Sequence, residues 1–234
     1  MKLHRFYIEE TVGNADQIRI ASSGIGEQLQ RVVKRKPGDN IIIFDNSGFE
    51  YEVVIIGYDN YTIICDVKKK TVNNILPKRE VYLFASIVKK DKFEWIVEKG
   101  TELGVTHIIP VISARSEKKD LNTDRLKRIS VEACEQSGRA TIPEIADILN
   151  LDDAITLSKS KTPVVIAFHT DGEIFKKEEF SKEAVISAFI GPEGGWTPEE
   201  IEMFHKSGMA VRNLGPQVLR AETAVVAALA QLVF

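Results

Sequence analysis

After about residue 80, strand-like apolar segments alternate with segments of helical periodicity, and no other feature of the chain constrains its fold as strongly. Apolar side chains recur at helical spacing within residues 92–104 and 124–138. The strands are predicted at residues 81–88, 107–112, 163–168, 184–190 and 209–214. Because strands that alternate with helices form parallel sheets covered on both faces, we expect an α/β domain built on a mainly parallel sheet.

The N-terminal part has a different pattern, with short strands separated by turns. Residues 39–46, 50–58 and 61–67 are rich in β-branched and aromatic side chains, and turn-forming Asn, Asp, Ser and Gly residues separate them. This pattern predicts a small antiparallel barrel. Residues 68–79 are polar, contain a proline and lack periodicity, so we place the linker there. The predicted domains are residues 1–71 and 72–234.

Composition narrows the setting in which the protein works. Hydrophobic residues make up 44% of the 234 residues, enough to bury a core. No apolar run approaches the ~18 residues that cross a bilayer, which predicts a cytoplasmic protein with no membrane partner. Cys65 and Cys134 lie far apart without further ligands at metal-binding spacing, so we expect no metal. The net charge is −3, but basic residues gather in clusters, which permits an RNA-binding face.

Two glycine-bearing loops follow successive predicted strands, Ile190-Gly-Pro-Glu-Gly-Gly195 and Leu214-Gly-Pro-Gln-Val-Leu-Arg-Ala-Glu-Thr223. In open α/β sheets, ligands bind beyond the carboxyl ends of the strands, where these loops would lie. Glycine allows backbone groups to approach a flat ligand such as adenine. A tight turn explains either loop alone, and the pair together favours a ligand site.

Two C-terminal helices have distinct signals. Thr197-Pro-Glu-Glu200 combines an N-cap threonine, a proline at the first helical position and a glutamate at N3, and Gly208 can end that helix. The last helix, from Glu222 to Phe234, is apolar nearly all round and must be buried in the core or against another subunit. Glu222 suits the positive end of this helix, whereas Arg220 gains nothing from the dipole, which favours a functional role for Arg220.

The segments GPEGGWTPEEIE and LGPQVLRAETAVVAAL resemble the two signature loops of the uridine N3-methyltransferases of small-subunit ribosomal RNA, a family within the SPOUT superfamily. KKDKFEWIVEKGTELGVTHIIPV, SARSEKK and RISVEACEQSGRATIPEI are similar to further segments of this family in the same order. LHRFYI and LQRVVKRKPGDNIIIFD resemble its PUA-like RNA-binding domain. The resemblance therefore covers essentially the whole chain.

This resemblance implies a PUA-like β-barrel followed by an α/β domain with a C-terminal trefoil knot. It also implies a homodimer, S-adenosylmethionine as cofactor and 16S rRNA of the small subunit as substrate. The predicted cofactor-binding residues are Phe168, His169, Ile190, Gly191, Pro192, Glu193, Gly194, Gly195, Leu214, Gly215, Val218, Leu219, Arg220, Thr223 and Ala224.

Transfer to N3 requires loss of the imide proton, and a cation beside O2 or O4 would stabilise the resulting anion. Arg220 and Arg115 are the candidates for this cation. Glu102 is a candidate base, with an ordinary helix-surface carboxylate as an equal alternative. Gln136 and Arg139 are predicted to orient the uridine or a phosphate. The predicted RNA contacts are Arg5, Arg31, Lys34, Arg35 and Lys36.

Two residues depart from the family pattern. Gln217 stands where the family commonly has arginine, and Gln28 stands where its barrel often has histidine. Gln217 keeps open a non-catalytic RNA-binding or ribosome-assembly protein, and another RNA target is a further alternative. A nucleotide-dependent oxidoreductase is disfavoured because no Gly-x-Gly-x-x-Gly turn follows an early strand.

Overall fold

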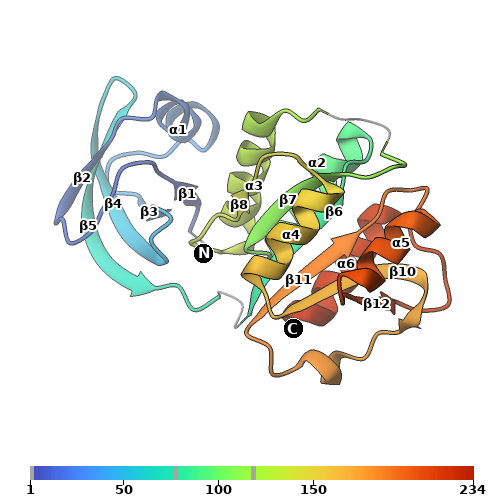
Figure 1. Cartoon of the computed structure of the whole chain (residues 1–234). Helices are drawn as coiled ribbons and strands as arrows, with labels where there is room; N and C mark the ends of the chain where they lie inside the picture. Colours follow the sequence, from blue (N-terminus) through green and yellow to red (C-terminus); the bar gives the residue numbers. More distant parts are fainter. Residues whose placement is uncertain (1–2, 76–78, 117–119) are drawn as a thin grey trace. The chain divides into compact units, whose positions relative to one another are not determined.

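The structure is a computed structural model that describes residues 3–75, 79–116 and 120–234 (Figure 1). The chain folds into two compact units. The first comprises residues 1–76 and 134–142, and the second comprises residues 77–133 and 143–234. Among the described residues, no helix is both long and apolar enough to cross a bilayer. The same residues hold no group of three or more His, Cys, Asp or Glu side chains arranged to bind a metal ion.

The first unit is built on one five-stranded sheet with the order β1-β3-β4-β5-β2. Strand β1 pairs parallel with β3, and the other pairings are antiparallel. The described pairings form an open path from β1 to β2, so the predicted closed barrel is not confirmed. The strands are β1 Arg5–Tyr7, β2 Gln17–Ile20, β3 Asn40–Phe44, β4 Phe49–Asp59 and β5 Thr62–Val72. A short helix α1 (Ser23–Glu27) and a π-helical turn η1 (Gln28–Val32) connect β2 to β3.

Strand β5 is longer than the sequence predicts. Residues 68–72, expected to belong to the linker, continue the strand and pair with β4. The pairing places Lys69 opposite Glu52, and a cross-strand pair of opposite charges stabilises a sheet. The polar composition of residues 68–72 suggested a linker. Composition alone does not reveal that β4 provides an oppositely charged partner for Lys69. Of the remaining linker, residues 76–78 lie outside the described residues.

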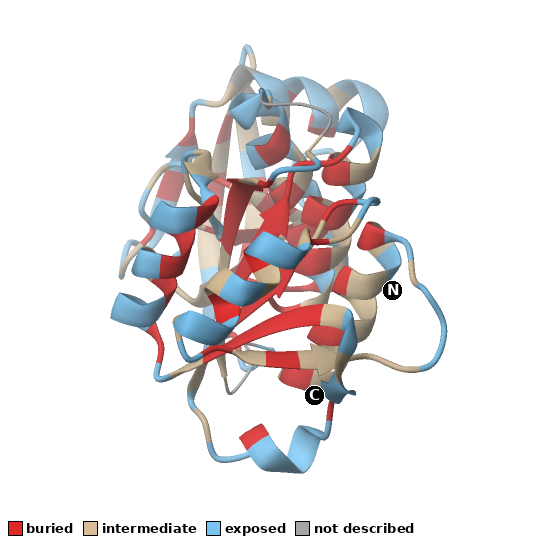
Figure 2. Cartoon of the chain, turned by 45° about the vertical axis from the view of Figure 1, so that its right-hand side comes forward, coloured by how far each residue is buried: buried red, intermediate tan, exposed pale blue. Residues whose placement is uncertain are grey.

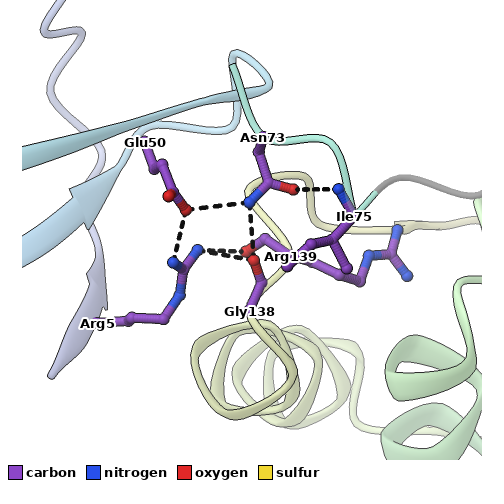
Figure 3. A network of polar contacts seen from close by, with 6 residues as sticks. All are labelled: Arg5, Glu50, Asn73, Ile75, Gly138 and Arg139. Carbon is purple, nitrogen blue, oxygen red and sulfur yellow. Dashed lines mark hydrogen bonds and ion pairs between the residues drawn. The ribbon is translucent and has the colours of Figure 1, made fainter. Parts of the chain in front are cut away.

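Residues 134–142 belong to the first unit, and a polar network connects the end of a helix there to the strands of this unit (Figure 3). Arg5 Nη1 donates to Glu50 Oε2 at 2.6 Å, and Arg5 Nη2 donates to the carbonyl of Gly138 at 2.9 Å. The amide of Asn73 donates to the same carbonyl at 2.9 Å and to Glu50 Oε2 at 3.1 Å. Helix α3 (Thr123–Ser137) ends directly before Gly138, whose φ is +92°. A cation and an amide thus satisfy a carbonyl at a helix C-terminus that would otherwise lack a partner.

The second unit is an α/β sheet with the order β12-β10-β11-β6-β7-β8, and β9 pairs with β7. All its described pairings are parallel, which confirms the predicted mainly parallel sheet. The strands are β6 Glu80–Ser86, β7 His107–Ile112, β8 Glu144–Ile145, β9 Leu149–Asn150, β10 Val164–Ile174, β11 Val185–Ile190 and β12 Ala210–Asn213. Besides α3, the helices are α2 Lys90–Leu103, α4 Leu151–Lys161, α5 Pro198–Lys206 and α6 Ala221–Val233.

Both faces of this sheet are buried, as expected for strands with continuous apolar runs. Alternate residues of β6 point to opposite cores, since Val81 and Leu83 pack with α2 and α6, whereas Tyr82 and Phe84 pack with α4 and α5. Figure 2 shows buried residues along the strands and on the inward sides of the helices. Ala228, in the middle of α6, is fully buried. At least one face of the apolar helix α6 therefore packs into the core of the second unit.

The helix signals of the sequence account for α5, but α4 was not predicted. At α5, Thr197 and Glu200 form the predicted capping box, and Gly208 follows the helix with φ of +72°. Asn150 is the N-cap of helix α4, and its side chain accepts a hydrogen bond from the amide of Asp153 at 2.9 Å. Asp152 and Asp153 lie in its first turn, where the helix dipole favours negative charge. The charges of these aspartates therefore stabilise the start of the helix.

Candidate cofactor and catalytic site

A cavity of about 390 Å³ opens beside β10, β11 and β12 in the second unit, where Phe168, Ile190 and Asn213 lie. Ile190 and Asn213 are the last residues of β11 and β12, and parallel α/β sheets bind ligands at the carboxyl ends of their strands. The volume of the cavity is in the range of cofactor sites. The lining residues come from β10, from the ends of β11 and β12, from both glycine loops, from the start of α6 and from the segment after β7. They are Arg115, Phe168, His169, Thr170, Asp171, Ile190, Gly191, Pro192, Glu193, Gly194, Gly195, Trp196, Asn213, Leu214, Gln217, Val218, Leu219, Ala221 and Ala224.

Most of the predicted cofactor residues line this one cavity. Gly215, Arg220 and Thr223 are not among the lining residues, although they lie on the second loop and at the start of α6. Residues outside the predicted cofactor-binding set also line it, namely Thr170, Asp171, Trp196, Asn213, Gln217 and Ala221. Two of them carried a signal in the sequence, Trp196 as a large apolar side chain directly after the first loop and Gln217 as a departure from the family pattern in the second.

The first loop packs closely on Trp196. A Cβ atom on Gly191 would lie 3.1 Å from Trp196 Cε2, so this position needs glycine for close packing. The indole Nε1 of Trp196 donates to the carbonyl of Phe168 at 3.2 Å, which ties the loop after β11 to β10. Gly195, with φ of +68°, closes a turn by donating to the carbonyl of Pro192 at 2.8 Å.

The side chain of Asn213 bridges two walls of the cavity. Its amide nitrogen donates to the carbonyl of Thr170, and its Oδ1 accepts from the backbone amide of Gly215 at 2.9 Å. Thr170 lies in a part of β10 where the pairing with β12 shifts register, since Phe168 and Glu173 both pair with Arg212. The four residues between them bulge out of the ladder. Asn213 thus joins this bulge to the second glycine loop.

Arg115 reaches the cavity from the segment after β7. Its Nη1 donates to the carbonyl of Gly194 in the first loop. A Cβ atom on Gly194 would lie 3.1 Å from Arg115 Cδ, so glycine there leaves room for the arginine. The backbone amide of the preceding Ala114 donates to Glu200 Oε1 at 2.8 Å. Arg115 is exposed, so a cation lies at the cavity with donors that remain accessible to a substrate.

Charged groups also surround the start of α6. Arg220 occupies the N-cap position of α6 and is exposed, and its side chain makes no capping hydrogen bond. Glu222 lies in the first turn, where the helix dipole favours its charge. Nearby, Lys92 Nζ donates to Glu193 Oε1 at 2.8 Å, and this hydrogen bond raises the pKa of Lys92. The loop carboxylate Glu193 is thereby paired with α2.

The other predicted catalytic residues, Glu102, Gln136 and Arg139, are not among the residues that line the cavity. Glu102 is exposed on α2 and accepts from Lys99 Nζ at 2.9 Å, which favours the helix-surface alternative. Gln136 and Arg139 belong to the first unit. Gln136 is exposed in the last turn of α3, whereas Arg139 is 2% exposed, and burial lowers the pKa of its guanidinium. Their predicted roles toward the uridine stay predictions.

The residues predicted to contact RNA all lie in the first unit, and their side chains differ in how far they are exposed to solvent. Lys34 and Lys36 are exposed. Arg31 is also exposed and contacts both Glu27 and the hydroxyl of Tyr61. The side chain of Arg35 is 16% exposed and lies 3.9 Å from Asp39. The side chain of Arg5 is 8% exposed with its Nη atoms bonded to Glu50 and Gly138, which favours a structural role over the predicted RNA contact.

Residues 75–233 match the family model of the RNA methyltransferase domain. The ribosomal RNA small subunit methyltransferase E of Rickettsia conorii is 30% identical over 239 residues, covering 99% of this chain and 96% of that protein. The chain belongs to this RNA methyltransferase family. The family member of the same name from Bacillus subtilis is 30% identical over 255 residues, with 98% and 96% of the two chains covered.

Solved structures of the family have the same fold. Ribosomal RNA small subunit methyltransferase E of Neisseria gonorrhoeae, bound to S-adenosylmethionine, has a TM-score of 0.89 at 28% identity and covers 98% of this chain and 96% of its own. A methyltransferase from Legionella pneumophila, in complex with the same cofactor, has a TM-score of 0.90 at 25% identity with 99% and 97% covered. The similarity thus extends over both units of the chain.

Proposed function

We propose that this protein transfers a methyl group from S-adenosylmethionine to N3 of a uridine in 16S rRNA of the small ribosomal subunit. The cavity between the two glycine loops, with Arg115 at its edge, carries the proposal. The relatives named as small-subunit rRNA methyltransferases support the substrate class. The relatives solved with S-adenosylmethionine support the cofactor.

The cavity fits this cofactor in size and in chemistry. The apolar side chains of Ile190, Leu214 and Leu219 line it and suit an adenine ring, whose edges can be read by loop backbone groups. Close packing at Gly191 and Gly194 keeps the first loop tight beside the cavity, since a Cβ atom at either position would meet a side chain at about 3.1 Å. S-adenosylmethionine, when bound, supplies an electrophilic methyl carbon.

The side chains of the protein have to stabilise the uridine that has lost its N3 proton, and they have to hold N3 in line with the methyl group. N3 of the neutral imide is a poor nucleophile because its lone pair is delocalised into two carbonyl groups. A guanidinium beside O2 or O4 favours loss of the N3 proton, and we assign this role to Arg115, with Arg220 as the second cation. Holding base and methyl group in line contributes further to the rate. Since N3 is hidden in a duplex, the target base must be unpaired or flipped out.

The remaining expectations form part of the same proposal. The first unit acts as a PUA-like RNA-binding domain, and the exposed Lys34 and Lys36 are candidates for its phosphate contacts. The C-terminal part of the second unit threads a trefoil knot, and two copies form a homodimer. The protein works in the cytoplasm, where its ribosomal substrate is assembled.

Calorimetric titration with S-adenosylmethionine, followed by transfer of labelled methyl to small subunits from cells lacking the endogenous activity, tests the proposal. Binding with label on uridine N3 supports it. Binding with label on another nucleotide points to another RNA target. Binding without transfer favours the alternative of an RNA-binding or assembly protein, which Gln217 in the cavity lining keeps open. Absence of cofactor binding contradicts the proposal.

A further inference from the structure

Glu200 is a nearly buried carboxylate that joins two separate segments of the second unit. It is 5% exposed and lies in the first turn of α5. Its Oε2 accepts from the backbone amide of Thr197 at 2.8 Å, as the capping box requires. Its Oε1 accepts from the backbone amide of Ala114 at 2.8 Å, in a segment 86 residues away in the sequence. A capping box needs only the first of these two bonds.

The second bond leads to the arginine at the cavity. Ala114 directly precedes Arg115, whose Nη1 donates to the carbonyl of Gly194. The short segment is also closed on itself, because Ser113 accepts from the amide of Ser116 at 3.1 Å and donates its own amide to Ser116 Oγ at 3.0 Å. A charge-assisted bond from Glu200 to Ala114 therefore fixes a compact turn, and the turn fixes the backbone from which Arg115 extends.

We propose that Glu200 is a positioning residue for methyl transfer, which holds Arg115 at the cavity through the amide of Ala114. This inference rests on the proposed function, in which Arg115 faces the uridine. An exposed arginine on an unanchored turn samples many orientations, and ordering it costs backbone and side-chain conformational entropy. Glu200 keeps the turn ordered before the substrate binds, so that only the side chain of Arg115 has to become ordered on binding.

The test compares E200Q with T197A. Glutamine keeps the volume of the side chain, but its single carbonyl oxygen can accept from only one of the two amides. T197A removes the hydroxyl that accepts from the amide of Glu200 at 3.3 Å, so it weakens the same helix cap without touching the bond to Ala114. We expect E200Q to lower kcat about 10-fold or more with small subunits as substrate, since misplaced groups cost that much or more. T197A should lower the melting temperature and leave kcat near the wild-type value.

A double-mutant cycle shows whether Glu200 acts through Arg115. If it does, E200Q lowers kcat in the wild-type background but causes no further loss in the R115A background. Equal losses in both backgrounds, or a kcat for E200Q that matches T197A, would overturn the proposal.

Amide hydrogen exchange provides a readout that does not depend on activity. The amide of Ala114 should be protected in the wild type and in T197A but exchange faster in E200A, which keeps no acceptor for it. Unchanged protection in E200A contradicts the inference. If the wild type transfers no methyl group, the proposed function fails, and the exchange of Ala114 alone decides whether Glu200 holds the Arg115 turn.

Discussion

Replacing Gly191 by alanine should disturb the cofactor cavity through one side chain, Trp196. The added Cβ would lie 3.1 Å from Cε2, 3.2 Å from Nε1 and 3.3 Å from Cδ2 of the indole. Carbon atoms in contact are normally separated by about 3.5 Å or more, so the shortest of these distances is roughly 0.4 Å too small. The ring has little space to retreat, because Trp196 is 3% exposed and packs edge-on against Phe204 with ring centroids 5.0 Å apart.

This steric strain should also weaken the hydrogen bond between Trp196 and the carbonyl of Phe168, which lines the same cavity. Trp196 Nε1 lies 3.2 Å from the carbonyl of Phe168, so a shift of the ring by a few tenths of an ångström away from this acceptor would break the bond. Overpacking of this kind costs about 1–3 kcal/mol, which lowers the melting temperature of a chain of this size by roughly 2–12 °C. Each ~1.4 kcal/mol that falls on the cofactor site weakens S-adenosylmethionine binding tenfold.

Differential scanning calorimetry and isothermal titration with S-adenosylmethionine measure the two effects. Gly57→Ala is the matched control, because a Cβ there would meet no atom within 4 Å, and it should leave both quantities nearly unchanged. In a W196F background, G191A should cost less, since phenylalanine lacks the indole nitrogen that the new methyl group would contact. A G191A variant with the melting temperature and cofactor affinity of the wild type would refute this reasoning.

Three further predictions concern a hydrogen-bonded bridge, a pair of exposed lysines and a buried histidine. N213A removes the hydrogen bonds that join Thr170 to Gly215, and leaving such groups without partners costs about 1–3 kcal/mol. Titration should therefore show S-adenosylmethionine binding weakened about 5-fold or more, and an unchanged Kd would contradict a role of this bridge in the cofactor site. K34E/K36E should weaken rRNA binding in a filter assay and reduce its salt dependence while cofactor affinity stays constant, and normal rRNA affinity would exclude these lysines as phosphate contacts. Burial beside Tyr82 lowers the pKa of His107 below the value of ~6.5 in the unfolded chain, although Glu80 and Glu144 oppose the shift. The unfolded state therefore binds more protons, and stability should fall as the pH drops below about 6.5, less so in H107Q; identical pH profiles of thermal unfolding would disprove this linkage.

Local signals predicted the regular elements well where they depend on neighbours in the sequence. The capping box at Thr197 and Glu200 involves residues three positions apart, and the apolar runs of β6 and β11 need no knowledge of their partners. The two glycine loops were predicted as a pair, and both line one cavity. Elements whose stability depends on a distant partner were predicted less well. Residues 68–72 join β5 because of β4, and they read as a polar linker in isolation.

The sequence by itself determined the α/β class, the order of most elements and the family, since these follow from periodicity, turn residues and ordered motifs. Only the tertiary structure decided which charged residues act together. The parallel pairing of β10, β11, β6 and β7 brings Arg115 to the carbonyl of Gly194, 79 residues further along the chain. The same kind of non-local contact commits Arg5 to Glu50 and Gly138. An arginine carries the same charge wherever it lies, and only the groups that the fold places around it determine whether it meets a ligand or a helix end.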